Sequence, residues 1–212
     1  MGAEMTQGRE VVCWVADVGS VRGGRFGWCR STGPEDHKTG SDIEAFAAGI
    51  AEDVRSGMKV ALGFECPLFV PVTVEADNLT SARKGEHNRS WSAGPGCAVL
   101  ATGLVEVAWV FMELKTRVGS TLRPTLAWTE LHEGDCNLFL WEAFVSGTAK
   151  GGDDKEDAAV AAESFWAAYP GVNEASSVTA ENPLSLVGAA LLWSGLSSNR
   201  SLLGASCVVI KS

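Results

Sequence analysis

Residues 11–19 read VVCWVADVG, a nearly continuous apolar run that is rich in residues favouring β-structure. The glycine-bearing turn VRGG follows and leads into RFGWCRS (25–31), so we expect these two segments to form a hairpin. Asp17 interrupts the end of the apolar run. The hairpin therefore carries a carboxylate where a buried strand ends.

A helix and a second buried strand are expected after the hairpin. Ser41 and Glu44 form a capping box, which opens a helix over 41–56. MKVALGFE (58–65) is then a strand that Pro67 stops, because proline cannot donate to a ladder. Since a strand, a helix and a strand in succession make a right-handed crossover, we expect the new strand to lie parallel to the first.

The second half of the chain continues the alternation of helices and strands. Apolar residues stepping by four and three predict a long helix over 98–118 that packs on the sheet. The other elements expected are a strand over 138–145, a helix over 153–168, a helix over 183–196 with Asn182 as its N-cap and Pro183 as its first residue, and a strand over 206–210. Residues 119–135 and 147–152 are read as loops, with 125–131 ambiguous between strand and helix.

This order predicts an α/β fold whose mixed sheet, an antiparallel hairpin plus parallel strands, is flanked by helices. The 212 residues, 46% of them hydrophobic, suffice for one sizeable core but not for two full domains. We therefore expect a single domain over 1–212, in which 170–212 form a C-terminal extension of one helix and one strand.

The cysteine pattern, the N-terminal residues and the net charge each restrict the kind of protein that is expected. The six cysteines show no CxxC pairing and lie mostly in apolar segments, which is typical of reduced, buried thiols in a cytoplasmic protein. The first ten residues lack the charged and apolar regions of a signal peptide, and no apolar stretch is expected to reach the ~20 residues that span a bilayer. The net charge of −9 repels polyanions, so contact with nucleic acid would need a local basic patch.

Four acids occupy positions where apolar runs end or are interrupted: Asp17, Glu65, Glu142 and Asp157. Burying a carboxylate is costly unless a cation compensates it, so four converging acids would indicate a site for divalent metal ions. Each also has an ordinary structural reading. An Asp that closes a strand can simply organise the turn, and Glu65 or Glu142 would face solvent if its strand lay at an edge.

The late helix needs a closer reading because it begins with several acids. Asp153 is suited to be its N-cap, and Asp154 and Glu156 lie in the first turn, where the helix dipole favours anions. Asp157 is one turn deeper and aligns with Ala161, on a face of small residues that can approach a sheet closely. Asp157 is therefore the preferred metal ligand of this helix.

A second group of residues lies in ARKGEHNRSWSAGPGC (82–97). Its members suited to binding phosphate are Arg83, His87, Arg89 and Trp91. Glycine-rich backbone at the start of the following helix presents N–H groups to anions, so this segment is a candidate substrate-binding loop. The alternative is a solvated charged loop with a capping turn.

The segments VADVGSVRGGRFGW, ALGFECPLFVP, LWEAFVSG and GGDDKEDAAVAA resemble those of an uncharacterised family of predicted ribonuclease-H-like nucleases. The resemblance spans roughly residues 11–168. It implies a ribonuclease-H-like fold and a hydrolase with a two-ion Mg²⁺ or Mn²⁺ site, held by Asp17, Glu65, Glu142 and Asp157, that cleaves nucleic acid or another phosphate-containing substrate. We expect Asp17, on the central strand, to bridge the two ions.

Two other classes of function stay open. Asp17-Val18-Gly19 also fits the first strand of nucleotide- or phosphate-binding proteins of the sugar-kinase and actin-like superfamily, although these usually have two such domains. The chain could instead be a non-catalytic interaction protein that keeps the fold. Eight tryptophans and the apolar 183–196 segment leave room for a homodimer interface, and no membrane partner is expected.

Overall fold

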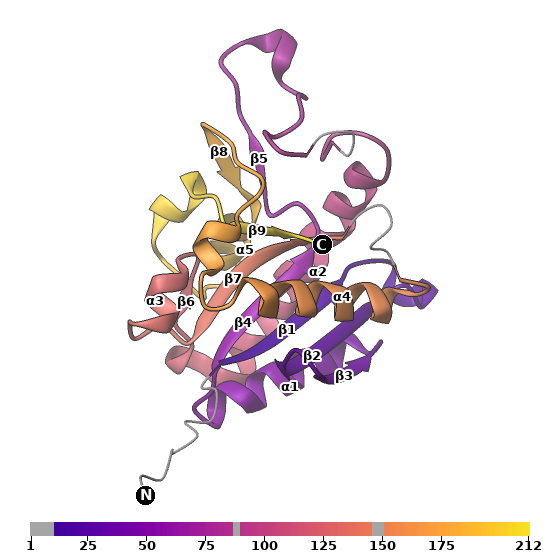
Figure 1. Ribbon diagram of the computed structural model, residues 1–212. Helices are drawn as coiled ribbons and strands as arrows, with labels where there is room; N and C mark the ends of the chain where they lie inside the picture. The colour runs from indigo at the N-terminus through magenta and orange to yellow at the C-terminus, as the bar shows by residue number, and fades with distance from the viewer. Residues whose placement is uncertain (1–10, 87–89, 146–150) are drawn as a thin grey trace, which may run out of the picture.

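The computed structural model describes residues 11–86, 90–145 and 151–212 (Figure 1). Its centre is a seven-stranded sheet in the order β3-β2-β1-β4-β7-β6, with β9 also paired to β7. These strands are β1 (Val11–Asp17), β2 (Gly27–Gly33), β3 (Asp36–Gly40), β4 (Lys59–Glu65), β6 (Pro124–Thr125), β7 (Leu138–Phe144) and β9 (Val208–Lys211). Strands β1, β2 and β3 pair antiparallel, whereas β1, β4, β7, β6 and β9 pair parallel.

Helices cover both faces of this sheet (Figure 1). The helices are α1 (Ile43–Arg55), α2 (Gly94–Val118), α3 (Trp128–His132), α4 (Asp154–Ala168) and α5 (Leu186–Trp193). The predicted α/β class, with a mixed sheet flanked by helices, is confirmed. A separate two-stranded sheet joins β5 (Phe69–Pro71) to β8 (Pro183–Ser185).

The alternation of side chains along β1 divides the interior into two cores. Trp14 and Ala16 belong to the core that α1, α2 and α5 cover, and Cys13 and Val15 belong to the core under α3 and α4. Because both faces of the strand are buried, its sequence is a continuous apolar run rather than an alternating one.

The predicted hairpin, the crossover helix and the parallel strand β4 are confirmed, but the helix has a different cap. Asp42, not Ser41, is the N-cap of α1, and its carboxylate accepts the N–H of Ala45 at 2.9 Å. Strand β3 was not expected from the sequence. It carries polar residues and forms the exposed edge of the sheet, so it lacks the apolar pattern that marks a buried strand.

The long predicted helix exists but begins earlier than expected, at Gly94. Its C-terminal half packs as the apolar spacing predicts, since Phe111 and Leu114 are fully buried, whereas Leu104 is 43% exposed. This helix also corrects the expectation that no apolar stretch is long enough for a bilayer. Residues 94–121 meet the length and composition criterion with 28% of the tested window buried, a weak signal that core helices of soluble proteins also give.

The predicted C-terminal helix over 183–196 is wrong at its start. Pro183 and Leu184 pair with β5 as strand β8, and the helix begins at Leu186 with Ser185 as its N-cap. Proline is tolerated as the first residue of an edge strand, so an Asn-Pro pair does not by itself specify a helix. The final strand is confirmed as β9.

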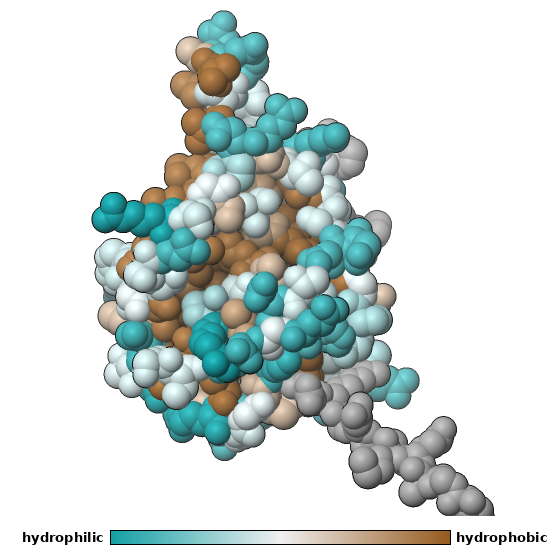
Figure 2. All heavy atoms as spheres, turned by 90° about the vertical axis from the view of Figure 1, so that its left-hand side faces the viewer, coloured by the Kyte–Doolittle hydropathy of each residue, from teal (hydrophilic) through white to brown (hydrophobic). Residues whose placement is uncertain are grey.

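Apolar side chains gather on the side of the molecule that faces the viewer in Figure 2, where β8 and α5 lie. The large apolar residues exposed in this part of the chain are Leu184 of β8 at 44%, Trp193 of α5 at 69%, and Leu203 of the 3-10 helix Arg200–Gly204 at 38%. Further along the molecule, Val74 is 99% exposed on the extension between β5 and α2. A homodimer interface remains a prediction for such a surface.

Candidate metal centre

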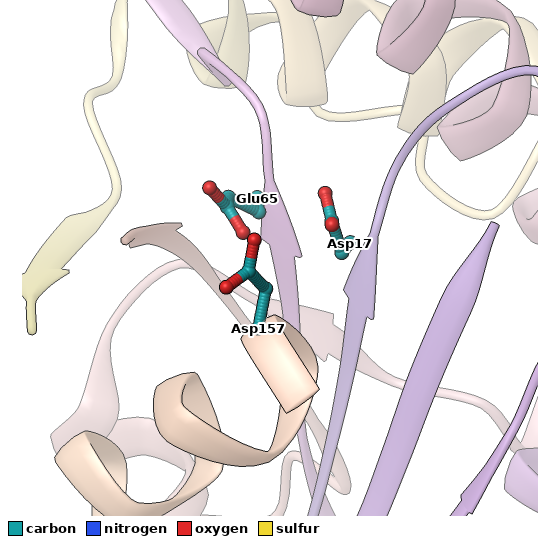
Figure 3. A group of neighbouring side chains, drawn as sticks. All are labelled: Asp17, Glu65 and Asp157. Atoms are coloured by element: carbon teal, nitrogen blue, oxygen red, sulfur yellow. The ribbon is translucent and has the colours of Figure 1, made fainter. Parts of the chain in front are cut away.

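Three of the four predicted acids converge where β1 and β4 end (Figure 3). Asp17 and Glu65 are the last residues of two adjacent parallel strands and stand directly beside each other in the register. Asp157 comes from the first turns of α4 and points at the same region. One carboxylate oxygen of each residue lies within 4.8 Å of the others.

The start of α4 is held beside Asp17 by a glycine contact. Gly27 pairs with Asp17 across the hairpin, and a Cβ built on Gly27 would lie 2.3 Å from the carbonyl carbon of Asp154. Only glycine therefore lets α4 approach β2 this closely. Arg25 adds an ion pair to Asp154 at 2.9 Å, so the helix that carries Asp157 is fixed to the end of the hairpin.

The acids at the start of α4 lie in different environments, and Asp153 is the N-cap as predicted. Its carboxylate accepts the N–H groups of Lys155 and Glu156, both at 2.9 Å. This contact lowers the pKa of Asp153 because the N–H groups favour the charged form. Asp157 is 6% exposed and accepts a hydrogen bond from the N–H of Gly151, so it is the acid of this helix that faces the interior.

The spacing and chemistry of the three acids suit a hard divalent cation. Oxygen ligands lie about 2.0–2.1 Å from Mg²⁺ and about 2.3–2.6 Å from Ca²⁺, so two oxygens that share one ion are at most about 4.2–5.2 Å apart. All three donors are carboxylate oxygens, which is the ligand type that Mg²⁺ and Mn²⁺ prefer. Asp17 is 9% exposed, so little water is available to compensate the grouped negative charge.

Glu142 lies outside this group. It pairs in register with Phe64, one residue before Glu65, and neighbouring residues of a strand point to opposite faces of the sheet. Glu142 is therefore on the α2 side, where both of its oxygens accept hydrogen bonds from Arg83 at 2.6 and 2.7 Å. The N–H of Leu68 donates to Glu142 as well, at 2.9 Å.

Arg83 is the cation that compensates Glu142. Its side chain has no exposed area, and it donates to Glu86 at 2.9 Å and to the carbonyl of Phe69 at 3.2 Å in addition to Glu142. Burial alone lowers the pKa of Arg83, but the Glu142 and Glu86 carboxylates outweigh it and raise the pKa above its usual value. Arg83 thus stays charged inside the protein, and its guanidinium group binds carboxylates of the protein instead of facing a substrate.

The other residues of the predicted substrate-binding loop have different positions. His87 and Arg89 lie outside the described residues. Trp91 is half-buried, and its indole N–H donates to the carbonyl of Ser81 at 2.9 Å, which ties the loop to itself. Phosphate binding by this loop therefore remains a prediction that Arg83 does not support.

One buried acid beside the site was missed by the sequence reasoning. Glu106 of α2 is 8% exposed, and burial raises its pKa to about 7, an effect that the N–H of Gly19 opposes and the nearby Asp17 charge increases. The signal was present in the sequence, because Glu106 interrupts the apolar run LATGLVEVAWVF as the other acids interrupt theirs. The expected helix drew attention to its apolar stripe instead.

Comparison of the chain with protein-family profiles, curated proteins and solved structures returns no match. A compact set of carboxylates at the ends of adjacent parallel strands can bind divalent ions, and bound ions can activate water and stabilise a leaving oxygen.

Proposed function

We propose that the protein is a metal-dependent phosphodiester hydrolase, a nuclease of ribonuclease-H-like fold that uses Mg²⁺ or Mn²⁺. The observation that carries this proposal is the convergence of Asp17, Glu65 and Asp157, whose ligand oxygens lie within 4.8 Å of one another. These acids come from three segments far apart in the sequence, and a bound divalent ion would offset the repulsion between their like charges. The antiparallel hairpin followed by parallel strands supports the fold that the family resemblance implies.

The three acids would divide the work of holding the metal. Asp17, on the central strand β1, lies between neighbours on both sides and is suited to bridge two ions. Glu65 and Asp157 would fix the ion on the α4 side. Bound divalent ions would lower the pKa of a water nucleophile and stabilise charge on the leaving oxygen. The protein residues would orient that water and the scissile phosphate.

An anionic substrate would be attracted only by positive charges close to the site. The net charge of −9 repels polyanions at long range, so attraction must come from the ions and from nearby cations. Arg25 is such a cation, since its side chain is 71% exposed while it pairs with Asp154 at the start of α4. We therefore expect Arg25, rather than the buried Arg83, to contact a substrate phosphate.

The test is cleavage of labelled RNA, DNA and RNA–DNA hybrid by the purified protein in Mg²⁺ or Mn²⁺. Asp17→Asn and Asp157→Asn should abolish cleavage, because each removes a charged ligand while keeping the shape of the side chain. Glu163→Gln is the matched control on α4, since the Glu163 side chain is 58% exposed and should not affect activity.

Cleavage that persists in chelator, or that Asp17→Asn leaves intact, would refute the proposal. Thermal stabilisation by nucleotides without cleavage would instead favour the phosphate-binding alternative of the sugar-kinase and actin-like type. Absence of both metal binding and cleavage would favour an interaction protein.

A further inference from the structure

Glu106 is a buried carboxylate whose burial is not explained by its protein contacts. The residue is 8% exposed, and among the described residues Oε2 has no hydrogen-bond partner. Within residues 11–86, 90–145 and 151–212, the influences on its charge are burial, the N–H of Gly19 and the Asp17 carboxylate, with no cation among them. Keeping a charged carboxylate buried without a partner costs free energy of folding, and a bound cation would offset that cost.

The packing of α2 brings Glu106 to the same edge of the sheet as the three clustered acids. A Cβ on Gly103 would lie 2.5 Å from Sγ of Cys66 and 3.4 Å from a methyl carbon of Val18. Cys66 and Val18 are the residues directly after Glu65 and Asp17, so α2 touches the chain where both acidic strands end.

Glu106 follows Gly103 by three residues and therefore lies on the same side of α2. Its carboxylate meets the backbone of Gly19, two residues beyond Asp17. Asp17 consequently has Glu65 and Asp157 on the α4 side and Glu106 on the α2 side.

We propose that Glu106 is a further ligand of the metal centre, binding a second divalent ion through Oε2. Asp17 would bridge this ion to the one that Glu65 and Asp157 hold, because a shared carboxylate offsets the repulsion between two close cations. This inference rests on the proposed metal-dependent function and names the residue that would make its site a two-ion site.

The experiment is a titration of the whole metal-free chain with Mn²⁺. Binding is measured by calorimetry and by the electron paramagnetic resonance signal of the free ion. The wild-type protein should bind two Mn²⁺ ions, and Glu106→Gln should lose one of them or bind it at least about tenfold more weakly. Asp17→Asn should weaken both ions, since it removes the bridge.

The matched control is Glu113→Gln, the same substitution on the same helix. Glu113 forms an ion pair with Arg117 at 2.9 Å. The Glu113→Gln protein should bind Mn²⁺ as the wild type does. Because Glu106→Gln keeps the shape of the side chain and removes a buried charge whose Oε2 has no hydrogen-bond partner among the described residues, the variant should remain folded. In the absence of metal, its melting temperature at pH 8 should equal or exceed the wild-type value.

Two results would overturn the role of Glu106 while leaving the hydrolase proposal intact: two ions bound equally well by Glu106→Gln, or a single ion bound by both proteins. If the wild-type protein binds no Mn²⁺ at all, the proposed function fails and this inference fails with it. Loss of one ion in Glu106→Gln but not in Glu113→Gln supports the assignment.

Discussion

Replacement of Arg83 by methionine tests the buried ion pairs beside the candidate metal centre. The side chains of Arg83 and Glu86 are 0% exposed and that of Glu142 is 1% exposed, so the substitution strands two carboxylates away from water. Each keeps one backbone donor, because Leu68 N–H still binds Glu142 and the N–H of residue 83 still binds Glu86. These donors satisfy one oxygen on each acid and leave the lost charge uncompensated.

The expected cost follows from these contacts. Breaking a buried ion pair by removing one partner costs about 3–5 kcal/mol, which applies to the two-oxygen contact with Glu142. Loss of the contact with Glu86 adds about 1.5–3 kcal/mol, the range for a hydrogen bond to a charged group. We therefore expect Arg83→Met to lower the free energy of unfolding by about 4.5–8 kcal/mol at pH 7.

The deficit should depend on pH in a defined direction. Burial raises the pKa of Glu142 even with Arg83 present, and Arg83 opposes that effect, so Arg83→Met should raise the folded-state pKa of Glu142 further above its unfolded value of about 4.3. A raised pKa contributes stability that is complete below the unfolded value and is lost as the pH rises through the folded value. The difference between Arg83→Met and the wild type should thus be smallest near pH 4 and grow towards pH 8.

Urea unfolding at 25 °C from pH 4 to pH 8 measures this difference. Lys84→Met is the control, because Lys84 is exposed and its replacement should change stability by less than about 0.5 kcal/mol. A deficit of Arg83→Met below about 1 kcal/mol at pH 7, or one that does not vary with pH, would refute the reasoning.

Three further predictions concern individual contacts. Gly27→Ala should push α4 away from β2, lower stability by about 1–3 kcal/mol and weaken Mn²⁺ binding measured by calorimetry, whereas Gly204→Ala, with no atom within 4 Å of the new Cβ, should do neither. Asp42→Ala should cost about 1 kcal/mol in urea unfolding, and Ser41→Ala should cost little, because Asp42 caps α1. Metal-free wild-type protein should lose up to about 3 kcal/mol of stability as pH rises from 4.5 through about 7, since folding raises the pKa of Glu106 and so favours its protonated form, and urea unfolding of Glu106→Gln should lack this loss.

Local pattern was sufficient for the framework of the fold. The apolar run of residues 11–19 predicted the strand β1, and the same pattern located β4 and β7. It was insufficient for β3, an exposed edge strand without an apolar pattern, and for Pro183, which pairs with β5 instead of opening a helix. In both cases the partner strand, distant in sequence, determined the local structure.

The candidate site shows the same division. Asp17 and Glu65 meet because β1 and β4 are parallel, which the strand–helix–strand order predicted, and because their register pairs the two acids, which only the structure shows. Asp157 joins them because Gly27 admits α4 at the end of the hairpin, a contact that no local pattern reveals. Glu106 was overlooked because a helix was judged by its apolar stripe rather than by the acid within it.

The amino-acid sequence by itself determined that several acids interrupt apolar segments and that each of them, if buried, would need a compensating partner, because desolvating a charge is costly. Only the tertiary structure decided which partner each acid has. Glu142 faces the opposite side of the sheet from Glu65 and meets Arg83, 59 residues away in the chain. An acid within an apolar segment is visible in the local sequence. Which cation lies beside that acid depends on the face of the sheet to which its side chain points and on how the helices and loops pack there.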